Sequence, residues 1–226
     1  PNIAITFGGD FLMRTKDGGV NWYSPGHIAN IMTGSQISYN YYDTSLFGFG
    51  AQDYAGAYTD NGGYTWKPIG SPSNSYGALM ADEKTIIGSY VVSWYGSYPS
   101  LLYYSNNRGE SYTLTQLEQP SCLSNERNKL RSLQSLKNPE ILFCGGYRSS
   151  DNGFTWERMN GCDQVFCINV IEPHELFGHV CESQEIIVSY DDGITWKPVV
   201  LLPNNTKSNI PSKMNVIDMS FDQVNK

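Results

Sequence analysis

A short polar turn closed by an aromatic residue recurs five times along the 226-residue chain. Each copy fits the pattern (S/T)-x-(D/N)-x-G-x-(T/S/N)-(W/Y). The copies are TKDGGVNW (15–22), TDNGGYTW (59–66), SNNRGESY (105–112), SSDNGFTW (149–156) and SYDDGITW (189–196). We call them the first to fifth turns and number the positions within each from one to eight. A fixed repeat length implies a repeated structural unit, so this feature constrains the fold more than any other.

The spacing of the turns predicts the size of that unit. Their third positions lie 44, 46, 44 and 40 residues apart and are Asp17, Asn61, Asn107, Asp151 and Asp191. A period of about 40–45 residues in a strand-rich chain is the length of one four-stranded propeller blade. Short apolar runs separated by Gly, Pro and Asn surround each turn, which is typical of a meander of hairpins. We expect each turn to join the third and fourth strands of a blade.

Composition agrees with an all-β chain. There are 16 Tyr and 22 Gly residues, and only 16% of the residues are charged, a balance that favours strands and turns over helices. No window keeps an apolar period of 3.6 residues. The stretch NERNKLRSLQSLKNPE (125–140) comes closest, and it lies where the repeat predicts a strand.

The two ends of the chain complement each other. The first residues, NIAITFGGDFLMRTKDGGVNW, supply the second, third and fourth strands of a blade but no first strand. The stretch KMNVIDMSFDQ (213–223) has the pattern of the missing first strand. We therefore expect a single domain over residues 1–226, a five-bladed β-propeller closed by pairing of the C-terminal strand with the N-terminal blade. The alternative is a fragment or subunit of a ring of six to eight blades.

The turns resemble those of the Asp-box, or bacterial neuraminidase repeat, propellers. That group includes sialidases, xyloglucan-active hydrolases, sortilin-type receptor domains and photosystem assembly factors. Three copies match well, the second has Asn for Asp, and the third combines Asn107, Ser111 and Tyr112. The resemblance implies that the turns lie on the outer rim, away from the usual site. It gives a structural role to position three and to the aromatic residues of position eight, which are Trp22, Trp66, Tyr112, Trp156 and Trp196.

The third position also has a physical explanation and a competing one. An Asp carboxylate can accept hydrogen bonds from backbone N–H groups that follow it, while Gly supplies a positive φ angle. The competing interpretation is a set of calcium loops, because DNG and DDG occur in such loops. A calcium loop needs several more oxygen ligands and a terminal Glu, which are missing. We expect no metal and no cofactor.

One loop on the opposite face has a distinctive composition. The stretch VSWYGSYPS (92–100) brings Trp94, Tyr95 and Tyr98 together, and we expect it near Tyr54 of the preceding blade. Exposed flat rings are suited to stacking on a sugar or a peptide. The alternative is that these rings pack on one another and on the neighbouring blade.

A glycoside hydrolase would need two carboxylates flanking one bond. Candidates at the ring opening are Asp10, Asp53, Glu118, Glu126, Asp163 and Glu182. No spacing selects a pair, and Asp53 and Asp163 are the pair we would test. A sialidase is disfavoured because Arg residues are few, the arginine motif before the first repeat is absent, and sialidases have six blades.

Charge and cysteine content bound the remaining classes. A net charge of −7 argues against nucleic-acid binding, and no apolar stretch reaches the ~18 residues needed for membrane insertion. The start has no signal-peptide pattern. Buried thiols and one or two disulfides both remain open, the latter implying an oxidising compartment. The five cysteines, none at zinc-site spacing, are Cys122, Cys144, Cys162, Cys167 and Cys181.

These observations favour a non-catalytic recognition or assembly module. It would bind a glycan or a protein partner through the loops opposite the turns, as a possible component of a larger assembly. An extracellular, virion or cell-surface location is favoured over the cytoplasm. The alternative is a glycoside hydrolase of unknown specificity.

Overall fold

The computed structural model describes residues 2–8, 11–24, 37–51, 56–69, 75–90, 100–118, 132–169, 175–180, 183 and 185–199. Within these ranges the chain forms strands and turns and no helix, so the prediction of an all-β protein is confirmed. Accordingly, the described residues offer no helical segment with the length and hydrophobicity to cross a bilayer. The stretch with a partial helical period contains strand β11 (Ser132–Gln134).

Every sheet is an antiparallel meander in which consecutive strands pair. The first sheet contains β1 (Ala4–Gly8) and β2 (Phe11–Thr15). The second contains β3 (Ile37–Tyr39), β4 (Phe47–Phe49), β5 (Ala57–Thr59) and β6 (Lys67–Pro68). The third contains β7 (Ser75–Met80), β8 (Ile86–Tyr90), β9 (Ser100–Ser105) and β10 (Thr113–Leu117). The fourth contains β11, β12 (Leu142–Cys144), β13 (Tyr147–Ser149) and β14 (Glu157–Arg158). The fifth contains β15 (Gln164–Asn169), β16 (Glu175–Val180), β17 (Glu185–Ser189) and β18 (Lys197–Pro198).

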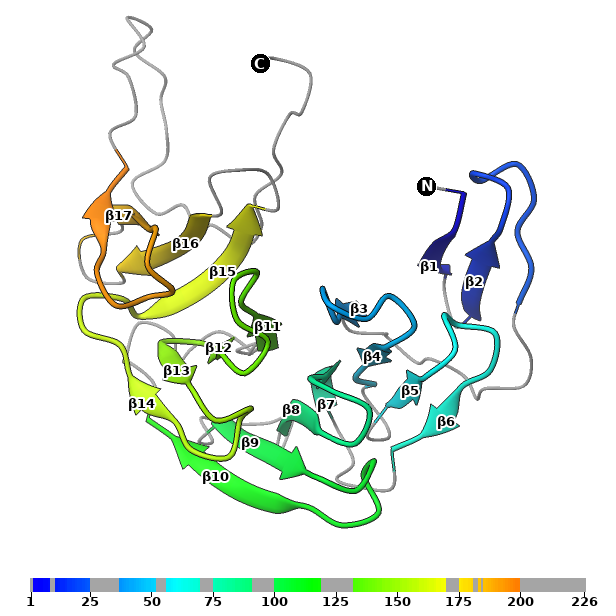
Figure 1. Ribbon diagram of the computed structural model, residues 1–226, viewed down its shortest axis with the longest axis horizontal. Coiled ribbons are helices and arrows are strands. Elements are labelled where there is room, and N and C mark those ends of the chain that lie inside the picture. Colours follow the sequence, from blue (N-terminus) through cyan, green and yellow to red (C-terminus); the bar gives the residue numbers. More distant parts are fainter. Residues whose placement is uncertain are drawn as a thin grey trace, which may run out of the picture.

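The five sheets follow one another around an arc in chain order (Figure 1). The first strands of the four complete sheets, β3, β7, β11 and β15, lie nearest the centre of the arc. In the first sheet, β2 is followed only by a single bridge between Arg14 and Tyr23. This arrangement is that of propeller blades. The first strand predicted for residues 213–223 lies outside the described residues.

Apolar clusters fill the spaces between neighbouring sheets. Strand alternation divides the third sheet between two of them: Met80 and Ile86 pack toward the second sheet, whereas Leu79 and Ile87 pack toward the fourth. All four side chains are fully buried. Because both faces of a blade are covered, its strands carry continuous apolar runs and not the simple alternation of a one-sided sheet. This explains why the burial pattern of β12 is unbroken.

Buried amide side chains tie the inner strands together at the centre. The Nδ2 group of Asn40 donates to the carbonyl oxygens of Met80, at 3.0 Å, and Ala81, at 2.8 Å. The Nε2 group of Gln134 donates to Ala81 O at 3.0 Å, and its Oε1 accepts from the Tyr41 N–H at 3.3 Å. These bonds join the second, third and fourth sheets. A buried polar network with its groups bonded fixes the relative position of the elements that it links.

Candidate functional site

The hydroxyl group at position one anchors every turn. It donates to the side-chain oxygen at position three, at 2.7 to 2.9 Å. It accepts from the N–H groups of position three, at 3.3 to 3.4 Å, and position five, at 2.8 to 3.0 Å. A buried hydroxyl is costly unless it is hydrogen-bonded, and these are at most 1% exposed. The residues are Thr15, Thr59, Ser105, Ser149 and Ser189.

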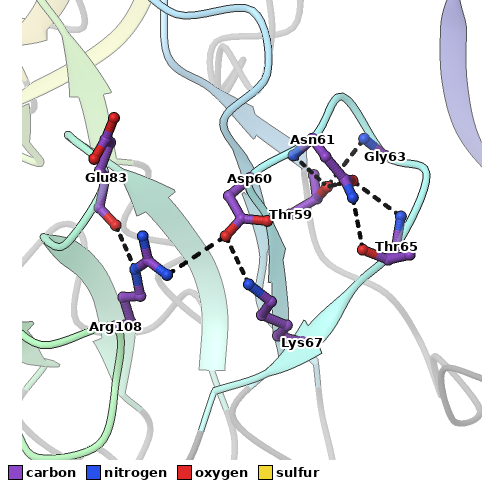
Figure 2. Close-up of polar contacts among 8 residues, drawn as sticks. All are labelled: Thr59, Asp60, Asn61, Gly63, Thr65, Lys67, Glu83 and Arg108. Atoms are coloured by element: carbon purple, nitrogen blue, oxygen red, sulfur yellow. Dashed lines mark hydrogen bonds and ion pairs between the residues drawn. The ribbon is translucent and has the colours of Figure 1, made fainter.

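The side chain at position three closes the turn on position seven. One of its oxygens accepts from the position-seven N–H in all five copies, at 2.8 to 3.0 Å. In the fourth turn, Asp151 Oδ2 also accepts from the Thr155 hydroxyl at 2.6 Å. In the second turn the direction is reversed, since Asn61 Nδ2 donates to Thr65 Oγ1 at 2.7 Å (Figure 2). The Asn of the second and third turns therefore keeps the hydrogen bonds that an Asp would make.

These hydrogen bonds hold the carboxylates in the charged state. The main-chain and side-chain N–H groups of Asn21, with the Thr15 hydroxyl, lower the pKa of Asp17 to about 2. Partial burial raises the pKa of Asp151, but bonds from Thr155 and Ser149 outweigh it, so the pKa lies below the ordinary value. The pKa of Asp191 is lowered against burial in the same way. A carboxylate that stays ionised is poorly suited to act as a general acid.

Position four, which the sequence pattern left unspecified, adopts the left-handed conformation in every turn. Its φ angles are 73°, 69°, 62°, 58° and 56° in Gly18, Gly62, Arg108, Asn152 and Asp192. Gly, Asn and Asp tolerate this region, whereas Arg does so at a cost. In the second, third and fourth turns the N–H of this residue donates to a carbonyl of the connection between the first two strands of the sheet, at 2.8 to 2.9 Å, and in the first turn it donates to the carbonyl of Asn2, just before β1, at 2.9 Å. Four of the five residues at this position are Gly, Asn or Asp, which tolerate a positive φ, and this composition was the sequence signal that could have identified it.

Position four also links each described sheet to its neighbour. Between the first and second sheets, Arg14 Nε donates to Gly62 O at 3.0 Å. Between the fourth and fifth, Arg148 Nε donates to Asp192 O at 2.9 Å. The third and fourth sheets are joined by a hydrogen bond from Asn152 Nδ2 to the Asp82 carboxylate. The side of the sheets that carries the turns is therefore a continuous framework.

At position four, the link between the second and third sheets is an ion pair between Arg108 and Asp60. Figure 2 shows Asp60 between Lys67, at 2.6 Å, and Arg108, at 3.6 Å. Arg108 Nε in addition donates to the Glu83 carbonyl at 2.8 Å. Both cations are partly exposed, so solvent screening makes the pair a weak contributor to stability. Arg108 nevertheless makes two polar contacts in its left-handed conformation, to the Asp60 carboxylate and to the Glu83 carbonyl.

The aromatic residues at position eight differ in burial. Trp66 is 8% exposed and packs on Phe49 with ring centroids 5.2 Å apart. Trp156 and Trp196 are partly buried against the apolar clusters of the fourth and fifth sheets. The indole N–H groups of Trp22, Trp156 and Trp196 donate to the position-five carbonyl, at 3.0, 2.9 and 3.2 Å. Trp22 and Tyr112 are the most exposed of the five, at 40% and 37%.

The predicted ligand-binding residues lie outside the described part of the chain, but the strands on either side of them are described. Trp94, Tyr95 and Tyr98 belong to residues 91–99, which connect β8 to β9. Asp53 and Tyr54 belong to residues 52–55, which connect β4 to β5. Both hairpins carry a turn at the far end of their second strand. Both connections therefore start at the ends of adjacent blades opposite the turns.

Of the proposed catalytic pair Asp53 and Asp163, only Asp163 lies in the described part of the chain. It contacts Arg158 and His179. Its Oδ1 lies 2.8 Å from Nη2 of Arg158, and its main-chain N–H donates to the His179 carbonyl at 3.0 Å. The carboxylate side chain is 18% exposed. Asp163 therefore forms an ion pair between the fourth and fifth sheets.

Two of the five cysteines are described as free thiols, Cys144 and Cys162. Both are buried, and burial raises the pKa of each thiol to about 12. Such thiols are poor nucleophiles and poor metal ligands at neutral pH. In the ranges that the structure describes, no three His, Cys, Asp or Glu side chains come together as a metal site.

This geometry defines the class of protein. Five antiparallel meanders around an arc, joined blade to blade at repeated turns, are the architecture of a β-propeller. Solved structures of β-propeller proteins align with most of the chain. The chain matches no protein-family model and no curated protein.

Three of these structures illustrate the likeness. An ancestral GH74 enzyme aligns with 88% of the chain at a TM-score of 0.63 and 13% identity. The GH74 xyloglucanase of Xanthomonas campestris aligns with 86% at a TM-score of 0.52 and 16% identity. YCF48 bound to D1 peptide aligns with 87% at a TM-score of 0.50 and 14% identity. The chain covers 29% of each GH74 protein and 64% of YCF48. At these identities the likeness concerns the fold alone.

Proposed function

We propose that the chain is a non-catalytic recognition or assembly module that binds a glycan or protein partner through the loops opposite the turns. The observation that carries this proposal is the position of two connections. Residues 52–55 connect β4 to β5 and residues 91–99 connect β8 to β9, two hairpins of adjacent blades whose turns lie at the other ends of β5 and β9. They contain Tyr54 and the Trp94, Tyr95 and Tyr98 group. We expect these rings to gather at one end of two neighbouring blades, where they would suit a flat ligand surface.

The described aspartates with displaced pKa values have a structural role. A glycosidase needs one carboxyl group whose pKa is raised, so that it can donate a proton at the working pH. Six described aspartates have displaced pKa values, and every displacement is downward. In each case hydrogen bonds within a turn or an ion pair favour the charged form. Carboxylates of this kind support architecture and not proton transfer.

We also propose that residues 1–226 form one domain, with the ring closed by residues 213–223 pairing beside β1. In three pairs of neighbouring sheets, the Gly at position five of one sheet approaches a strand of the preceding sheet, which is β1, β8 or β12. Gly63 faces Ile5, Gly153 faces Ile87, and Gly193 faces Phe143. Gly19 has no such neighbour within 4 Å among the described residues. By register, Phe177 of β16 is the corresponding residue of the fifth sheet.

Replacing Trp94 with alanine should weaken ligand binding at least about fivefold, since stacking on a large aromatic ring is worth about 1–3 kcal/mol. The measurement is a screen of glycan and peptide arrays followed by titration of the strongest binder. Tyr190→Ala is the control, because Tyr190 is 46% exposed but lies within the fifth turn. Absence of any binder, or equal binding by the Trp94 variant, would count against this function. Turnover of aryl glycosides that is lost in Asp53→Ala or Asp163→Ala would support the hydrolase instead.

A further inference from the structure

The outer strand of the third sheet is unlike the other described outer strands. β6, β14 and β18 have two residues each, and their sequences are Lys-Pro, Glu-Arg and Lys-Pro. Short length, charge and proline are the features that prevent a sheet edge from pairing with another chain. β10 has five residues, TLTQL, with no charge and no proline. Its edge therefore lacks all three protections.

The outer edge of β10 is also accessible within the described structure. β10 ends the strand order of its sheet, and no other described strand pairs with it beyond β9. Its first four residues are exposed, and only Leu117 turns inward. Figure 1 places β10 at the outer boundary of the molecule. A row of backbone N–H and C=O groups at such an edge is a template for another strand.

We propose that β10 pairs antiparallel with β10 of a second copy of this chain, forming a twofold dimer. With Thr115 on the twofold axis, Thr113 faces Leu117 and Leu114 faces Gln116. All of these pairs are uncharged, and Thr and Leu fit the pleated surface of a sheet. The nearest charge, Glu118, would face Tyr112 of the second copy, so the two edges bring no like charges opposite each other.

The comparison of the outer strands favours a second copy as the partner, in a dimer that adds no further copies. Only one of the four described outer strands is permissive, so the contact uses the same patch on both molecules and stops at two. A five-residue strand pair buries less than the ~1,200 Å² of a stable interface, so the dimer should be weak and reversible. Each copy carries a charge of −7, so added salt should strengthen association by screening their repulsion. This contact is separate from the loops opposite the turns.

The test uses opposite charges at the axis. Sedimentation velocity of the whole chain, from about 10 μM to about 1 mM, should show a concentration-dependent dimer. Thr115→Lys and Thr115→Glu place like charges opposite each other and should each lower the association constant at least about tenfold. Mixing the two variants should restore association, because Lys then faces Glu. Ile194→Lys, which adds the same charge at a 67% exposed position on another sheet, should associate like the wild type.

Several outcomes would overturn the proposal. A wild-type chain that stays monomeric over this range shows no pairing of β10 with itself. A dimer that persists in Thr115→Lys uses another surface. Loss of the dimer in both variants without recovery in the mixture excludes the self-paired register. Thr115 is exposed, and thermal melting of each variant establishes that it folds like the wild type.

Discussion

Replacing Gly153 with alanine should lower the free energy of unfolding by about 3 kcal/mol. Gly153 occupies position five of the fourth turn with φ at 88°, which costs an L-residue about 1 kcal/mol. An added Cβ would also lie 2.1 Å from Cδ1 of Ile87 in the preceding sheet. Ile87 is fully buried and cannot move aside without disturbing its cluster, which adds about 2 kcal/mol. Equilibrium denaturation in urea measures the change.

Gly161→Ala is the matched control for this prediction. Gly161 lies in the connection between β14 and β15 with φ at 79°, and an added Cβ there meets nothing within 4 Å. It should therefore cost only the backbone term of about 1 kcal/mol. Equal costs for the two variants would show that contact between the sheets plays no part at Gly153.

Gly19→Ala extends the same comparison to ring closure. Within the described structure an added Cβ at Gly19 meets only its own Trp22, at 3.8 Å. If the ring is closed as proposed, the fifth sheet packs here, and the variant should lose about 3 kcal/mol, like Gly153→Ala. A loss of about 1 kcal/mol, like that of Gly161→Ala, would argue for an open edge.

Replacing Asp151 with alanine should destabilise the protein by about 1.5 kcal/mol at pH 7. The variant loses bonds from the Thr155 N–H, the Thr155 hydroxyl and the Ser149 hydroxyl. Loss of a side chain that caps a helix start through similar hydrogen bonds costs about 0.5–2 kcal/mol. Asp151 is exposed to water, as such caps are, so we expect a similar cost. Asp151→Asn should cost less than about 0.5 kcal/mol, because Asn61 and Asn107 make the same set of bonds in their turns.

The two Asp151 variants should also differ from the wild type in acid. The folded pKa of Asp151 is lowered, so the charged side chain stabilises the fold above the unfolded pKa of about 3.8. This contribution is lost as the pH falls through the folded value. The advantage of the wild type over Asp151→Ala should therefore shrink below about pH 4, whereas the advantage of Asp151→Asn over Asp151→Ala should stay unchanged. Urea denaturation at pH 7 and below pH 4 measures both; a pH-independent Asp151→Ala cost would contradict it.

Much of the architecture could be predicted because it depends on local patterns. The positions of the third and fourth strands follow from the turns, since Ser or Thr, Asp or Asn, and Gly form their hydrogen bonds within seven residues. The Asn61 and Asn107 departures were visible in the sequence, but only the geometry shows that an amide preserves the bonds by reversing one donor. Burial of the position-eight rings could not be predicted individually, because it depends on the neighbouring sheet.

The candidate site was less accessible from the sequence. Asp163 could be assigned to a loop and Arg158 to the strand before it. The sequence did not show that their side chains meet, and the structure places Arg158 Nη2 2.8 Å from Asp163 Oδ1. The aromatic loop of residues 91–99 could be recognised from composition alone, because three rings stand within five residues. The shared end from which it and residues 52–55 leave adjacent blades is a property of strand topology.

By itself, the sequence determined the repeat, its period and the all-β class, because each turn is a local structure specified by eight consecutive residues. Only the tertiary structure decided how the repeats hold together. The position-four residues, the buried amide of Gln134 and the close approach of Gly153 to Ile87 join segments tens of residues apart. Such contacts depend on the distance between sheets, and no pattern within one repeat encodes that distance.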